Sequence, residues 1–285
     1  MAYRRSGVQI PSGPHPTMKF TTLSFSNHPD IIVPEYLTLV YPDDSQLPLS
    51  EQHFLLSIPW NDEYLQLVPT EYQDFFKAVL PHLHARTTDV HTATCCTYID
   101  SICTAISAEL GLSNINKKVV TLALILHDSG WSKLTEFEVA ASLGVSGLAL
   151  TKSAMGPKEK HAVEGVALAT EILQSHADEL SLSADEINLI LKAVRFHDQP
   201  EKVAAQGNSI PAEVRALVDL DHLWSFTQAN FWQDIYRKGI ATPQTYLDNL
   251  SRDLPTYFVT QSGRELALKL LSERQNEVSE FPQVK

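Results

Sequence analysis

The segment that ends at His127 and Asp128 carries the most informative chemistry in the sequence. Residues 119–126 are almost entirely apolar, which predicts a central, buried helix. Two ionisable side chains follow it directly, and a buried carboxylate is costly unless it is paired or bound to a metal. Taken alone, the pair also has a simpler explanation, in which Asp128 caps a neighbouring helix and His127 donates one hydrogen bond in the core.

Two further residues fall on apolar helix faces. Stepping by three or four residues from His91 meets Cys95, Tyr98 and Ile102, so His91 begins the face that points to the core. Asp221 continues an apolar stripe in the same way. Asp219 lies about 200° round that helix from Asp221 and should point away from the shared face.

His161 and His197 pass the same test. His161 leads a stripe that continues through Gly165 and Leu168, and His197 closes one that includes Val194. Five predicted helices thus each present a His or Asp to the interior, and four of these positions are near a helix end. A shared metal site explains this convergence better than five separate core residues do.

The ligand types indicate the metal and the reaction. Imidazole and carboxylate together suit manganese or iron, with magnesium, zinc, nickel or cobalt as other options, and one or two ions. Two His and two Asp leave coordination positions open for a substrate oxygen and water. An ion there can polarise a phosphoryl group and lower the pKa of the attacking water.

The elements that must position these residues are predicted to be helical. We expect an all-α domain over residues 71–285, preceded by an irregular N-terminal arm over 18–70 with one or two short strands around 31–33 and 36–41. The expected helices are 70–84, 88–110, 115–128, 136–143, 158–176, 184–198, 211–237, 243–253 and 262–280. Residues 4–13 read like an accidental translation of a transfer-RNA gene, so we expect translation to start at Met18 and residues 1–17 to be a non-native leader. The segment 144–157 is either a lid over the site or a connector.

The order His91, His127-Asp128, Asp221 resembles the HD superfamily of metal-dependent phosphohydrolases, over roughly residues 85–280. The segment from Leu124 to Gly130 looks like the Leu-Leu-His-Asp-Ile-Gly of that family, and Asp221 matches its final Asp motif. The resemblance implies an HD-domain helical bundle in which these four residues are metal ligands. It implies an enzyme that hydrolyses a nucleotide or another small phosphate ester, with Asp128, His127 or a nearby His assisting proton transfer.

Two features depart from this pattern. Many family members have a Lys directly after the His-Asp-x-Gly segment, and Trp131 stands there in this chain, with Lys133 close by. His161 and His197 look like the extra histidines of members with two metal ions, such as cyclic-dinucleotide phosphodiesterases and di-iron oxygenases. An HD-type di-iron oxygenase and a non-catalytic HD regulatory module are therefore the alternative functions.

Charge and composition limit the partners. A formal net charge of −12 argues against a nucleic-acid duplex or an anionic membrane and leaves a small phosphorylated substrate. Lys133, Lys158, Lys160, Lys192 and Arg195 flank the proposed ligands in sequence, and of these we take Lys133, Lys158 and Arg195 as candidates for substrate contact. No apolar run is long enough for a membrane helix, and we expect a cytoplasmic protein whose oligomeric state is open, a homodimer included.

The remaining histidines and the cysteines are expected to have structural roles. His15, His28, His53, His82, His84, His176 and His222 are not predicted as ligands. Cys95, Cys96 and Cys103 lie within nine residues and lack CxxC spacing, so we expect small packing residues in a reduced protein.

Overall fold

The computed structural model describes residues 18–143 and 156–282. The expected all-α class is confirmed, because the only sheet in this part of the chain is a two-stranded hairpin. The predicted leader over residues 1–17 and most of the segment 144–157 lie outside the described residues.

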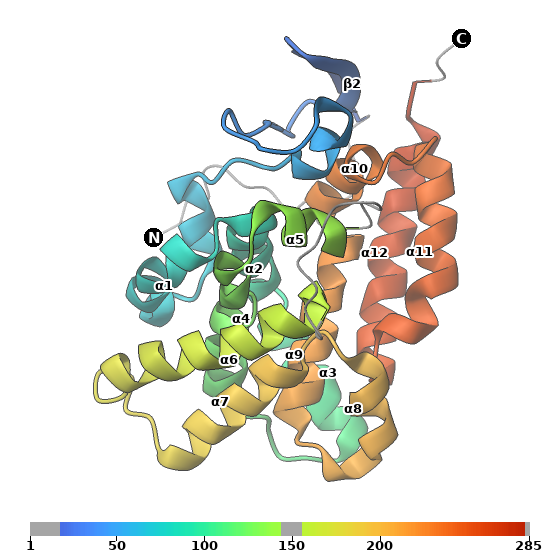
Figure 1. Ribbon diagram of the computed structural model, residues 1–285. Helices are drawn as coiled ribbons and strands as arrows, with labels where there is room; N and C mark the ends of the chain where they lie inside the picture. The colour runs from blue at the N-terminus through green and yellow to red at the C-terminus, as the bar shows by residue number, and fades with distance from the viewer. Residues whose placement is uncertain (1–17, 144–155, 283–285) are drawn as a thin grey trace, which may run out of the picture.

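Helix α4 (Lys117–Leu126) is the centre of the molecule (Figure 1). Every side chain from Val119 to Leu126 is buried, as the sequence predicted, and Asn116 caps the helix by accepting a hydrogen bond from the Val119 amide. The neighbours that pack on α4 are α1 (Gln73–Val79), α2 (Thr88–Cys96), α3 (Ile99–Leu110), α7 (Ala184–Phe196) and α9 (Ala212–Leu223). A helix covered on so many sides brings its C-terminal end into the interior, where water is excluded.

The other helices enclose this group. Helices α5 (Glu136–Ser142) and α6 (Pro157–His176) follow the central helix, and α8 (Pro200–Gln206) links α7 to α9. The chain ends in α10 (Gln228–Arg237) and an antiparallel-looking pair, α11 (Pro243–Tyr257) and α12 (Gln261–Ser279), seen at one side of Figure 1. Helix α12 packs on α3 and α9 as well as on α11, so it ties the C-terminal part to the centre.

The N-terminal arm is more regular than predicted. Strand β1 (Phe20–Phe25) pairs antiparallel with β2 (His28–Pro34), and β2 packs on α10. The expected strand over 36–41 is wrong, because only Val40 pairs there, with Ser57. Short 3-10 helices follow, including η1 (Leu49–Leu55) and η2 (Asp62–Leu67). Ile31, Val33 and Leu37 join the same hydrophobic core as the helices.

Several predicted helices are divided or shifted. The expected helix 88–110 breaks between α2 and α3, and the expected helix 211–237 breaks at the 3-10 turn η8 (Trp224–Phe226). Helix α1 occupies only part of 70–84, and α11 runs through Pro255 to Tyr257 instead of ending at 253. Each break changes the direction of the chain so that both halves can bury an apolar face. This is an effect of tertiary packing, which the spacing of apolar residues in the sequence does not predict.

The three cysteines are buried and unpaired, as expected for packing residues. Burial raises the pKa of Cys96 and Cys103 to about 12, so both stay thiols. Among the described residues, no helix combines the length and apolar character that a membrane crossing requires.

Candidate metal centre

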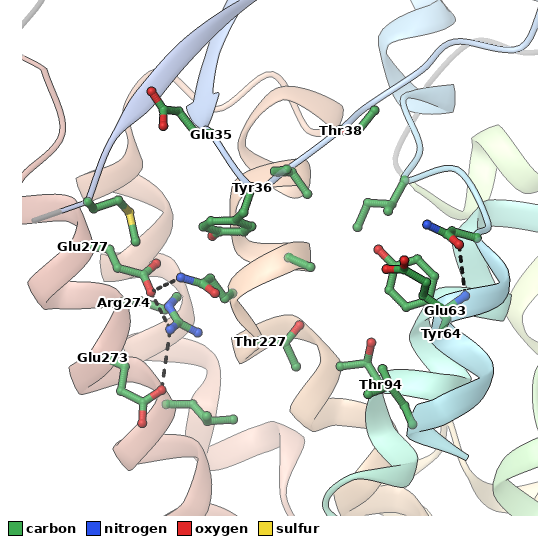
Figure 2. A pocket seen from close by; sticks show the side chains of 18 of the residues that line it. Glu35, Tyr36, Thr38, Glu63, Tyr64, Thr94, Thr227, Glu273, Arg274 and Glu277 are labelled. Atoms are coloured by element: carbon green, nitrogen blue, oxygen red, sulfur yellow. Dashed lines mark hydrogen bonds and ion pairs between the residues drawn. The ribbon is translucent and has the colours of Figure 1, made fainter. Parts of the chain in front are cut away.

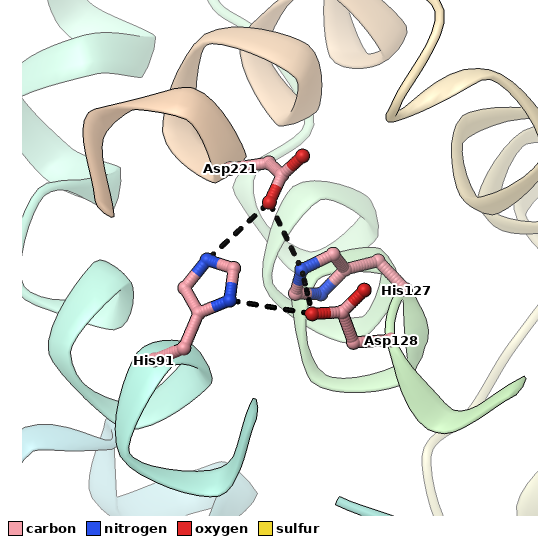
Figure 3. A group of neighbouring side chains, drawn as sticks. All are labelled: His91, His127, Asp128 and Asp221. Carbon is pink, nitrogen blue, oxygen red and sulfur yellow. Dashed lines mark ion pairs between the residues drawn. The ribbon is translucent and has the colours of Figure 1, made fainter. Parts of the chain in front are cut away.

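Four side chains, from two helices and from the end of a third, meet in the interior (Figure 3). His91 comes from α2, and Asp221 comes from the last turn of α9. His127 and Asp128 directly follow α4, which ends at Leu126. One ligand atom from each residue lies within 4.8 Å of the others, and the group could hold a metal ion.

The imidazoles of this group point their Nε2 atoms at one carboxylate oxygen. His91 Nε2 and His127 Nε2 lie 3.3 Å and 3.4 Å from Asp221 Oδ1, and Asp128 Oδ2 lies 3.4 Å from His127 Nε2. Neither Nε2 atom has a hydrogen-bond partner among the described residues, although both are buried. Buried polar atoms are normally satisfied, so two that face a common point indicate a missing partner.

A backbone contact sets the tautomer of His127. Its Nδ1 lies 2.6 Å from the Leu124 carbonyl oxygen, which can only accept, so Nδ1 carries a proton and donates it. In the neutral imidazole the lone pair is then on Nε2, the atom that faces Asp128 and Asp221. A ring oriented in this way by an outer hydrogen bond is typical of metal-ligating histidine.

His161 and His197 form a second group on the other oxygen of Asp128. Their Nε2 atoms lie 3.7 Å and 3.6 Å from Asp128 Oδ1 and 3.0 Å from each other. His197 follows α7 as His127 follows α4, and its Nδ1 lies 2.6 Å from the Val194 carbonyl oxygen. The structure thus brings together all six predicted ligands, with Asp128 between the two groups.

Two glycines allow His161 to come this close. Gly130 lies in the 3-10 turn η6 (Ser129–Lys133), and Gly165 lies one turn beyond His161 on α6. A Cβ atom on Gly130 would clash with the backbone carbonyl of His161 and with the Gly165 amide. The absence of a side chain at Gly130 therefore sets the distance between Asp128 and α6.

Two tryptophans cover the imidazoles. The Trp131 ring stacks on His161 with centroids 4.0 Å apart, and its Nε1 donates to Asp128 Oδ1 over 2.9 Å. Trp224 stacks on His91 at 5.1 Å. Trp131 stands where the sequence resemblance leads one to expect Lys, and that substitution was the only sequence signal of its role.

The electrostatics show that the site requires positive charge. Burial would raise the pKa of Asp128, but the His127 charge and hydrogen bonds with His197 and His91 hold it well below its usual range. Burial lowers the pKa of His127, yet the Asp128 and Asp221 carboxylates raise it to about 9. Either protons on the imidazoles or a cation between them must neutralise the two carboxylates.

The three basic residues predicted to contact substrate do not reach this centre. In the described part of the chain, no hydrogen bond or ion pair joins Lys133, Lys158 or Arg195 to its six residues. Lys158 pairs with Asp198 at 3.1 Å, and Arg195 pairs with Glu159 at 3.5 Å. Lys133 is exposed at the end of η6.

One histidine that the sequence set aside does lie beside the centre. His222 forms a third group with Asp198 and Asp221, all partly exposed. This group marks the side on which Asp221 approaches solvent, and Lys158 reaches it through Asp198. His222 lies off the apolar face of α9, so a test based on apolar stripes could not find it.

Comparison with protein-family models, curated proteins and solved structures finds no match to the chain. Its functional assignment therefore depends on the chemistry of its own residues.

Proposed function

We propose that the protein is a metal-dependent phosphohydrolase of the HD type that acts on a nucleotide or another small phosphate ester. The observation that carries the proposal is the convergence of His91, His127, Asp128 and Asp221, with two buried Nε2 atoms that lack partners among the described residues. The order of these residues in the sequence, which resembles the HD superfamily, supports it independently.

The donor set fits a divalent transition metal. Neutral imidazole nitrogen and carboxylate oxygen suit manganese or iron, and the buried thiol of Cys95 has its pKa raised well above its usual value by burial, so it is not a competing thiolate. A bound ion would supply Lewis acidity at the phosphoryl group and acidify the attacking water.

The protein's own groups would orient the ligands, accept a proton and admit the substrate. The Leu124 carbonyl holds His127 in the tautomer whose lone pair faces the centre. Asp128, with one oxygen toward each group of histidines, is placed to accept a proton from water. The partly exposed side with Asp221, His222 and Asp198 is the side from which a substrate would enter, and Lys158 there offers a cation to phosphate once Asp198 releases it.

The proposal is tested by a screen for phosphate release from nucleotides and sugar phosphates with manganese or ferrous iron. We expect turnover by the wild type and none above background by His91→Ala. His82→Ala is the matched control, because His82 lies outside the centre, and it should keep wild-type activity. Metal-loaded wild-type protein that releases no phosphate from any member of the panel would contradict the proposal.

A second candidate function is an HD-type di-iron oxygenase. The observation that favours it is the second group, in which His161 and His197 face Asp128 Oδ1, because six ligands with a shared carboxylate suit two irons. Two irons per chain together with dioxygen consumption on addition of substrate would favour this candidate. One ion per chain and phosphate release would favour the hydrolase.

A further inference from the structure

A large cavity lies between the N-terminal arm and the helical body (Figure 2). Its volume is about 1300 Å³, larger than most pockets that bind small molecules. None of the described residues that line it belongs to the candidate metal centre. The cavity is therefore a separate feature that the proposed hydrolysis does not use.

Two opposite walls of the cavity carry carboxylates. Figure 2 shows Glu273 and Glu277 of α12 on one side and Glu63 of η2 on the other, where Asp62 also belongs to the lining. Glu35 adds another near the turn that follows β2. Two separated acidic walls suit a ligand with a positive group at each end.

The basic groups of the lining offset only part of this negative charge, because two basic residues face six acidic ones, which are Glu35, Asp62, Glu63, Glu273, Glu277 and Glu280. Arg274 is almost fully buried and already bound, with its Nη2 2.6 Å from Glu277 Oε1 and 3.5 Å from Glu273 Oε2. Lys19 is the other basic residue among the described lining residues. The cavity repels a phosphate ester and attracts a cation, so it differs in chemistry from the substrate side of the metal centre.

Aromatic rings form another part of the lining. Figure 2 shows Tyr36 projecting into the cavity from the arm, and 51% of its surface is exposed. Tyr64, Tyr98 and Trp60 also belong to the lining. Aromatic faces attract cations and cover apolar chains, so the walls are suited to both parts of an amphipathic amine.

We infer that this cavity binds a diamine or polyamine, an organic cation with basic groups at both ends of an apolar chain. The acidic walls would hold the two ammonium groups, and Tyr36 and its aromatic neighbours would cover the chain between them. The inference does not depend on the proposed hydrolase function.

The test is calorimetric titration of the full chain, in chelator so that the metal centre plays no part, with three probes of equal length. Diaminooctane carries two ammonium groups, octylamine one and octanediol none. We expect saturable binding of one diaminooctane per chain, weaker binding of octylamine and none of octanediol. Equal binding of diol and diamine, or no saturable binding of the diamine, would overturn the inference.

Two double variants distinguish binding in the cavity from nonspecific electrostatic attraction to an acidic protein. E63Q/E273Q removes one carboxylate from each wall, and we expect it to weaken diaminooctane binding about tenfold. E171Q/E179Q removes the same charge from exposed positions outside the cavity and should bind like the wild type. Equal weakening by both double variants would show diffuse attraction to the net charge and refute the site. Thermal melting of each variant confirms that it is folded.

Discussion

The candidate metal centre and the Asp234 cluster both bury a carboxylate, but they satisfy it in opposite ways. In the Asp234 cluster, Asp234 of α10 accepts from Tyr246 at 2.7 Å and Asn230 at 3.3 Å and pairs with Lys238 at 2.6 Å. The His–Asp contacts of the metal centre are 3.3 to 3.7 Å long. Direct contacts to one oxygen anchor two helices, whereas longer contacts around a common point leave room for an ion.

The same contrast occurs within helix α9. Asp219 accepts hydrogen bonds from the Val259 amide and the Thr260 hydroxyl, and so fixes the start of α12. Asp221, two residues later, faces His91 and His127 instead. The sequence argument placed these two carboxylates on different faces, and the structure shows that one serves packing and the other the centre.

Asp128→Ala gives the largest expected effect. It removes the carboxylate that lies between both groups of histidines, so metal affinity should fall by more than about 100-fold, since even outer partners contribute 10- to 100-fold. The fold should survive, because the Asp128 side chain caps no helix in the described part of the chain and its contacts are with side chains of the centre and with Trp131. Metal titration measures the affinity, and circular dichroism shows whether the variant is folded. Unchanged metal affinity would contradict the view that the carboxylates of the candidate metal centre bind an ion, whereas Asp234 only joins helices.

Asp234→Asn should have the opposite effect to Asp128→Ala, in that it should lower the stability of the fold and leave metal binding intact. The neutral amide removes the buried negative charge that pairs with Lys238 at 2.6 Å and with Arg237 at 3.8 Å, so the free energy of unfolding at neutral pH should fall by about 3 kcal/mol, with metal content unchanged. Burial would raise the pKa of Asp234, but Lys238 and Arg237 outweigh it and lower the pKa below 3.8. Because its pKa is lower in the folded protein than in the unfolded chain, Asp234 stabilises the fold at any pH above the unfolded-state pKa. This stabilisation is lost as the pH falls through the folded-state pKa.

Urea unfolding of wild type and Asp234→Asn across the acid range checks this pH dependence. The difference between the two proteins should be constant at neutral pH and shrink below about pH 4, near the usual pKa of Asp. A difference that grows toward low pH would mean that the pKa of Asp234 is raised instead.

Gly130→Ala tests whether backbone packing sets the second group. The added methyl must push α6 away, so we expect a loss of about 1–3 kcal/mol in the free energy of unfolding, as for other overpacked sites. His161 should withdraw from Asp128, which lowers metal content below that of wild type. Gly156→Ala is the control, because nothing lies within 4 Å of its Cβ position. Equal behaviour of the two variants would refute the role of Gly130.

Trp131→Phe is expected to have the smallest effect. It keeps a ring over His161 but removes the hydrogen bond to Asp128 Oδ1, and metal affinity should fall by about tenfold. Trp224→Phe retains the stack on His91, and the Trp224 indole makes no hydrogen bond to any residue that the structure describes, so this variant should bind metal like wild type. If Trp131→Phe also binds like wild type, the indole is only a packing group.

The sequence predicted the centre because its ligands lie on helices with strong apolar periodicity. His91, His161 and His197 each begin or end an apolar stripe, and the apolar run before His127 predicts burial directly. His222 and Trp131 were missed as members of the site, because neither follows from periodicity. Their positions depend on how α9 and η6 pack against their neighbours, which is a property of the tertiary structure.

The N-terminal arm shows the opposite case. Its prolines and short apolar runs predicted irregular structure with a short strand around 31–33, which lies within β2, but they did not predict β1. The β1–β2 hairpin packs on α10 through β2. The cavity beside it has walls from the arm, α2 and α12, which are far apart in the sequence. No local pattern could predict a space between them.

The most direct test of the central assignment is the metal content of wild-type protein purified without added metal or chelator, measured by plasma mass spectrometry. The account predicts at least one divalent transition metal ion per chain, or uptake of manganese or iron on titration with a rise in melting temperature. Protein that contains no metal and takes up none would contradict it, and the six residues would then be a buried polar cluster neutralised by protons.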